Sequence, residues 1–142
     1  MSEGTFHKVG TSEKRMYGAT CILVCGYPPA DQAALLSVLQ ENGFINLPVV
    51  FATAQDLDRT LKEILAPDHP PGEGELSGMD RAVILSGFTE NELHRLIRTY
   101  REARMPPQHW ATLTPISEGW HLKDLLKELA AEAEAMKKRT QT

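Results

Sequence analysis

The chain is poor in cysteine, with only Cys21 and Cys25 among its 142 residues. Both lie in the apolar run TCILVC, and residues four apart in a strand are separated by about 13 Å. A disulfide requires Cα atoms within about 7 Å, so these two residues cannot be bridged to each other. We therefore expect two buried, reduced thiols, which is the state that a cytoplasm maintains.

Long apolar runs and an excess of positive charge are also missing. No segment approaches the ~20 apolar residues that span a bilayer, and the polar N-terminal segment lacks the apolar core of a signal peptide. The formal net charge of −4 argues against nucleic acid or an anionic membrane as the main partner. These absences predict a cytoplasmic protein without membrane association.

Motifs for catalysis or for a cofactor are missing as well. The segment CGYPPA, which follows the first apolar run, lacks the glycine spacing of dinucleotide-binding and phosphate-binding loops. The histidines show no mutual ligand spacing; they are His7, His69, His94, His109 and His121. We therefore predict no catalytic residue, no metal and no cofactor, and we rank an enzyme last among the functions considered.

Four apolar segments, each followed by apolar residues at helical spacing, indicate four strand–helix units. The segments are Thr20–Cys25, Val49–Phe51, Ala82–Leu85 and Trp110–Thr114. Successive units of this kind predict an α/β fold, a small parallel sheet of strand order 2-1-3-4 covered by helices on both faces. No signal in the sequence rules out the order 1-2-3-4. The alternating threonines of the fourth segment are typical of an edge strand.

Domain boundaries follow from composition. Residues 1–17 are polar and aperiodic, which predicts a flexible arm, and residues 18–139 are predicted to form a single domain. Residues 67–80 have the sequence PDHPPGEGELSGMD, which is too rich in proline, glycine and acid to contribute to a core. We predict a disordered surface loop there.

A binding site is expected beyond the carboxyl ends of the strands, where ligands of α/β sheets bind. No Asp, Glu, His or Lys stands at those ends, so a non-catalytic small-ligand-binding or regulatory module is the first hypothesis. The residues predicted to line the site are Tyr27, Ser86, Gly87, Thr114, Ser117 and Trp120. Backbone amides at the helix starts after Gly87 and near Trp120 would hold a small anion. Trp120 is also expected to be mostly buried, pinning the entry to the last helix.

The alternative hypothesis is a protein–protein interaction domain. The C-terminal helix carries an apolar stripe that could pack on the sheet or on a partner, and an oligomer could form through it. The stripe consists of Leu122, Leu126, Leu129, Ala133 and Met136. The helix face from Arg95 to Arg104 is rich in arginine and could instead grip phosphate or an acidic partner.

The second half of the chain resembles a known family. An apolar strand ending in Ser86-Gly87 is followed by Thr114-Pro115 and by Trp120. A helix with leucines at 122, 125, 126 and 129 comes next. In these features the chain is similar to a bacterial family, domain of unknown function 3783. The resemblance implies a similar small α/β fold and adds weight to the cluster of Ser86, Thr114 and Trp120, but it implies no activity.

A chelator should leave the protein unchanged, because the sequence contains no cluster of metal ligands. We expect the melting temperature, followed by scanning fluorimetry, to be the same with and without excess EDTA. A drop of several degrees that Zn²⁺ restores would contradict this prediction.

Overall fold

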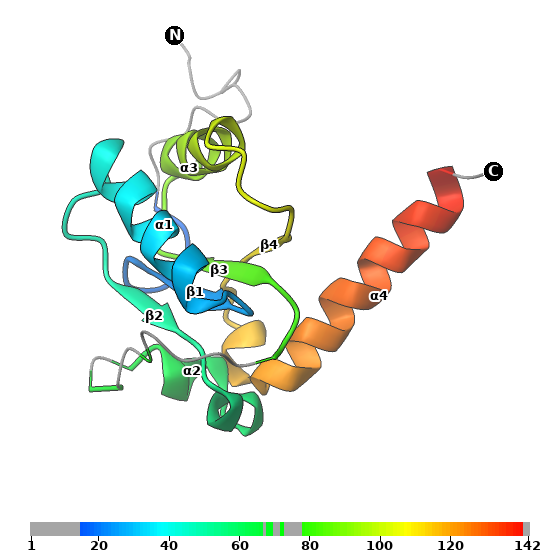
Figure 1. The fold of residues 1–142 in the computed structure, drawn as a ribbon. Helices are drawn as coiled ribbons and strands as arrows, with labels where there is room; N and C mark the ends of the chain where they lie inside the picture. Colours follow the sequence, from blue (N-terminus) through cyan, green and yellow to red (C-terminus); the bar gives the residue numbers. More distant parts are fainter. Residues whose placement is uncertain (1–14, 67, 70–71, 73–77, 141–142) are drawn as a thin grey trace, which may run out of the picture.

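The computed structural model describes residues 15–66, 68–69, 72 and 78–140 (Figure 1). Strands and helices alternate along this part of the chain. The strands are β1 (Cys21–Cys25), β2 (Val49–Phe51), β3 (Ala82–Ser86) and β4 (His109–Thr112). The α-helices are α1 (Pro29–Glu41), α2 (Leu61–Ile64), α3 (Glu90–Glu102) and α4 (Leu122–Thr140), and the 3-10 helices are η2 (Ala54–Asp58) and η3 (Ser117–Gly119). Most of the predicted arm and of the predicted 67–80 loop lies outside the described residues.

The strands form one sheet in the predicted order, β2-β1-β3-β4, with β4 at an edge. β1 is parallel to β2, and β3 is parallel to β4. β1 and β3, however, run antiparallel, with Cys21 opposite Ser86 and Cys25 opposite Ala82. The prediction of a purely parallel sheet is therefore wrong, because the sheet is mixed and the carboxyl ends of its strands lie in two pairs at opposite ends.

The connection from β2 to β3 explains the reversal. A parallel strand requires a crossover that carries the chain back to the end where the previous strand began. In the described part of this connection the helices are only η2 and the four-residue α2, which is about 6 Å long, so no crossover helix runs back along the sheet there. The chain instead enters β3 from the end where β1 stops. At that end the backbone of Met79 and Asp80, just before β3, lies close to Gly26, just after β1.

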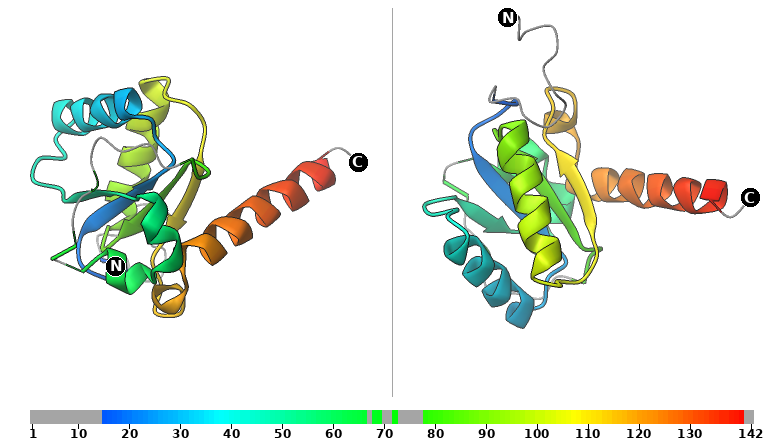
Figure 2. Two further views of the ribbon diagram at one scale, coloured as in Figure 1. Left: turned by 60° about the horizontal axis from the view of Figure 1, so that its bottom comes forward. Right: turned by 90° about the horizontal axis from the view of Figure 1, so that it is seen from above.

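Successive residues of the central strands point to opposite faces of the sheet, and their side chains pack into two separate hydrophobic cores. Ile22 packs on one face with residues of α1 and α3, including the buried Leu96. Leu23 packs on the other face with residues of α2 and α4, including the buried Leu122. Helices therefore cover both faces of the sheet (Figure 2), and the uninterrupted apolar character of β1 and β3 reflects burial on both sides.

Two short helices, η2 and α2, follow β2. The spacing of the apolar residues from Leu57 to Leu65 in the sequence would instead predict one continuous helix. The capping box of Thr53 and Asp56 closes the start of η2, and a second box of Thr60 and Glu63 closes the start of α2. Because the second helix has its own cap, the chain is extended at Arg59, with φ −103° and ψ 154°. This interruption places Arg59 on an extended segment between the two helices.

Trp120 is more exposed than predicted. Trp120 retains 38 % of its accessible surface as a residue, whereas Leu122, the first residue of α4, is fully buried. Leu122 therefore anchors the entry to α4. Trp120 contributes through its backbone, because its carbonyl accepts a 3.0 Å hydrogen bond from the N–H of Leu61.

Cys21 and Cys25 are free and buried, as predicted. Burial raises the pKa of both thiols, and the negative charge of Asp56 raises the pKa of Cys25 further. A raised pKa disfavours the thiolate, so neither residue is suited to nucleophilic or redox chemistry. None of the described helices is both long enough and apolar enough to span a bilayer.

Substituting Gly87 tests how tightly the turn after β3 is packed. Gly87 has φ +71°, and a Cβ there would lie 2.5 Å from the carbonyl oxygen of Gly18. Gly87→Ala should therefore lower the free energy of unfolding by about 3 kcal/mol or more, combining left-handed strain with a backbone clash. Gly78→Ala is the matched control, because Gly78 has φ +75° but, apart from its chain neighbours, none of the described residues comes within 4 Å of its Cβ position. Gly78→Ala should lower the free energy of unfolding, measured in urea, by only the ~1–2 kcal/mol that a left-handed backbone costs a residue with a side chain. Equal losses for the two variants would contradict the clash.

Candidate functional site

The structure separates Tyr27 from the other residues predicted to line a site. Tyr27 follows β1, at the end of the sheet where β3 and β4 begin, and it is 2 % exposed. Its hydroxyl donates to Oε1 of Gln108, and the guanidinium of Arg81 stacks 3.8 Å from its ring centre. Burial raises the pKa of Tyr27 strongly, and the hydrogen bond with Tyr100 adds to the shift. Tyr27 is thus part of a buried polar network.

Ser86 and Gly87 lie at the opposite end of the sheet and are tied into the fold. The hydroxyl of Ser86 is buried and donates a 2.6 Å hydrogen bond to the carbonyl of Ala19. The start of α3, expected to hold an anion, is capped by Thr89, whose hydroxyl accepts from the backbone N–H of Glu92. Glu92 in turn accepts from the backbone N–H of Thr89 and pairs with Arg15 at 2.8 Å. Side chains of the domain itself therefore occupy that helix start.

Thr114, Ser117 and Trp120 lie near each other in the chain after β4. The hydroxyl of Ser117 accepts from the backbone N–H of Thr114 at 3.0 Å, and the Thr114 hydroxyl accepts from the N–H of Ser117 at 3.0 Å. These two residues close the turn that contains η3, and they are exposed or half-buried. Their role in binding stays a prediction.

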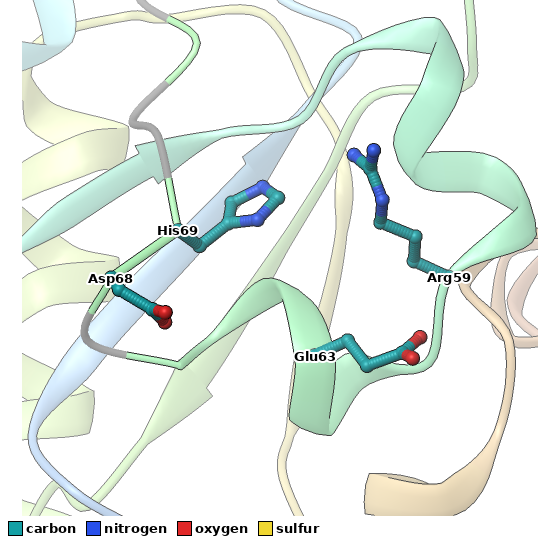
Figure 3. Close-up of a pocket in the computed structure, with 4 residues that line it drawn as sticks. All are labelled: Arg59, Glu63, Asp68 and His69. Atoms are coloured by element: carbon teal, nitrogen blue, oxygen red, sulfur yellow. The ribbon is translucent and has the colours of Figure 1, made fainter.

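A pocket that the sequence did not indicate lies beyond the carboxyl end of β2. It has a volume of about 280 Å³ and is lined by Arg59, Glu63, Asp68 and His69. Figure 3 shows the imidazole of His69 and the guanidinium of Arg59 on one side of this space. The carboxylates of Asp68 and Glu63 lie on the other side.

Asp56 organises the nitrogen-bearing side of the pocket. Its carboxylate is 1 % exposed, and Oδ1 lies 2.6 Å from Nη1 of Arg59 and 3.1 Å from Nε2 of His69. Oδ2 accepts from the backbone N–H of Thr53 at 2.9 Å. Burial by itself would raise the pKa of Asp56, but the hydrogen bonds from Thr53 and Arg59 and the interaction with His69 lower it overall. The carboxylate is therefore ionised and fixes the orientation of both side chains.

The backbone around Arg59 is held by the start of α4. The N–H of Leu122 donates to the carbonyl of Arg59 at 3.0 Å, and Thr60 forms an isolated bridge with His121. Nearby, Nζ of Lys123 pairs with Asp58 at 2.9 Å. Two segments more than fifty residues apart in the chain thus fix the extended stretch that presents Arg59.

The contacts with Asp56 use only some of the hydrogen-bonding atoms of Arg59 and His69. Arg59 contacts Asp56 through Nη1, and no hydrogen bond with another described residue is seen for its Nη2 and Nε donors. His69 contacts Asp56 through Nε2, and its other ring nitrogen, Nδ1, has no hydrogen bond with a described residue. A carboxylate that orients a histidine also occurs in general bases, but the residues that line this pocket include no Ser, Cys, Thr or Lys for such a base to activate. Within the described residues no three His, Cys, Asp or Glu side chains are grouped as metal ligands.

The arginine-rich face of α3 is only partly free. Nη1 of Arg95 donates to the carbonyl of Asn42 at 2.7 Å, and its guanidinium stacks 4.0 Å from the ring centre of Phe44. Arg95 therefore fastens α3 to the end of α1. Arg98, Arg101 and Arg104 are exposed.

Residues 81–136 match the family model described as Domain of unknown function (DUF3783). This confirms the resemblance seen in the sequence. The DUF3783 match extends from β3 through η3 into α4, and it does not include Asp56, Arg59 or His69. No curated protein and no solved structure matches the chain.

Asp56→Asn should destabilise the domain and flatten its acid sensitivity. The pKa of Asp56 is lower in the folded than in the unfolded protein. Its charge therefore adds to the free energy of unfolding at pH values above the unfolded pKa of about 3.9, and this stabilisation is lost as the pH falls through the folded pKa. We expect a loss of about 2–4 kcal/mol in urea unfolding at pH 7, shrinking toward zero at acidic pH. Asp58→Asn is the control, since Asp58 is exposed and pairs only at the surface. A loss for Asp56→Asn that is independent of pH would contradict the role of the charge.

Proposed function

We propose that this domain is a small-ligand-binding module whose site is the pocket of Arg59, Glu63, Asp68 and His69. The observation that carries the proposal is the arrangement of charge across the pocket, with Arg59 and His69, both in contact with the buried Asp56, on one side and the carboxylates of Glu63 and Asp68 on the other. The position supports it, because the pocket lies beyond the carboxyl end of β2, where ligands of α/β sheets bind.

The charges define the class of ligand. A simple anion would be attracted by Arg59 but repelled by Glu63 and Asp68, and a simple cation would meet the reverse. A small zwitterion avoids both conflicts when its carboxylate faces Arg59 and His69 and its ammonium group faces Asp68 and Glu63. The cavity of about 280 Å³ is near the lower limit for ligand sites, which suits a molecule the size of an amino acid.

Protein interaction is the second candidate function. The arrangement of α4 favours it, because this helix extends past the sheet and is exposed along most of its second half (Figure 2). The two functions use different surfaces, so one does not exclude the other.

Binding can be tested by thermal shift and by calorimetry with matched probes. L-alanine and L-glutamate should stabilise the domain, whereas propionate and ethylamine, which each carry only one of the two charges, should bind far more weakly. A ligand at a hundred times its Kd adds ~2.7 kcal/mol, which either measurement detects.

Variants distinguish this pocket from a site elsewhere. Arg59→Met and Asp68→Asn should each weaken amino-acid binding by about tenfold or more, because each removes one charged contact. Arg98→Met on α3 is the control and should bind as the unchanged protein does. The proposal fails if no amino acid stabilises the domain, or if both pocket variants retain full binding.

A further inference from the structure

The outer edge of β4 is open in the described sheet. The backbone N–H of His109 donates to the carbonyl of Arg81, the residue before β3, at 3.2 Å, and the N–H of Leu113 donates to the carbonyl of Leu85 in β3 at 2.8 Å. In a parallel ladder the intervening residues face the other way, so Trp110 and Thr112 direct their N–H and C=O groups away from β3. All four residues of β4 are partly exposed. Such an edge is a template for a further strand.

A groove of about 360 Å³ follows this edge. Leu93 and Ile97 of α3 line one side, Leu129 and Glu132 of α4 line the other, and residues 110–112 of β4 lie between them. Most of these side chains are apolar, and an exposed apolar groove marks an interaction surface. The groove therefore offers an added strand both backbone partners and apolar contacts.

α4 continues beyond this edge. Figure 2 shows the helix leaving the sheet on the side of β4 and ending away from the domain. Residues 131–138 are exposed apart from the half-buried Ala133. A helix of 19 residues is about 28 Å long, so its second half can reach over a neighbouring molecule docked at β4.

The charges on α4 favour a second copy of the chain as the neighbour. Lys127, Ala130 and Glu134 lie on one side of the helix, at spacings of three and seven residues. Lys127 and Glu134 are exposed. Two such helices that run in opposite directions, with the axis near Ala130, set each Lys127 against Glu134 of the other copy. The surface is thus complementary to itself, as a twofold interface requires.

We propose that the domain forms a twofold dimer in which β4 pairs antiparallel with β4 of a second copy and the two α4 helices lie side by side. An axis perpendicular to the sheet produces both contacts, because it reverses strand and helix directions and keeps each face of the sheet on the same side. With the axis at Ala111, Trp110 of one copy is opposite Thr112 of the other, and the two pairs exchange four backbone hydrogen bonds. A specific dimer buries at least ~1,200 Å², so the α4 contact is needed in addition to the short strand. The dimer does not depend on the proposed ligand.

Sedimentation velocity of the full chain tests the dimer. We expect a concentration-dependent monomer–dimer equilibrium over about a hundredfold range that brackets a micromolar Kd. Thr112→Pro removes an outward N–H that an edge strand can spare within its own sheet, and it should abolish dimer formation. Thr112→Ala retains the N–H and should dimerise normally.

Charge reversal provides a second test that does not alter the strand. Lys127→Glu and Glu134→Lys should each weaken the dimer on the order of tenfold, because each sets like charges against each other. The double variant K127E/E134K restores the opposite charges and should recover most of the affinity, with helicity checked by circular dichroism. A monomer at every concentration overturns the proposal, and so does a dimer that survives Thr112→Pro or a double variant that fails to recover.

Discussion

The antiparallel pairing of β1 with β3 is the contact on which the rest of the structure depends. Both strands are buried on both faces, so their register fixes the two cores at once. The pairing also divides the strand ends into two groups. The ends of β1 and β2 lie together, and those of β3 and β4 lie at the opposite end of the sheet. A single site formed by all four carboxyl ends is therefore not available in this fold.

The same topology accounts for the pocket beyond β2. Residues 68–69 belong to the connection that leads to the start of β3, and they lie beside η2. There Nε2 of His69 meets the buried carboxylate of Asp56, which already holds Arg59. One buried charge thus joins the turn after β2 to the following connection. Removing a charge of this kind leaves its partners unpaired, so it links stability to the geometry of the pocket.

Much of the fold could be predicted from the sequence because it rests on local patterns. The continuous apolar runs at β1 and β3 identify central strands, and the threonines of β4 identify an edge strand. The spacing of Thr53 and Asp56 and of Thr89 and Glu92 is that of a capping box, and in the structure both pairs cap the start of a helix. These signals concern hydrophobic period and backbone hydrogen bonds within a few residues, which a sequence displays directly.

The direction of β3 and the content of the pocket were decided only by the tertiary structure. Apolar period does not distinguish a parallel from an antiparallel central strand, since both are buried on two faces. The spacing of Thr53 and Asp56 in the sequence is compatible with a helix cap, but no local pattern could show that Arg59 and His69 share the carboxylate of Asp56. Those contacts arise where three segments lie side by side. They are the extended stretch at Arg59 between η2 and α2, the start of α4, and the connection to β3 that carries His69. Their partners are distant in the chain, and no local pattern records such an encounter.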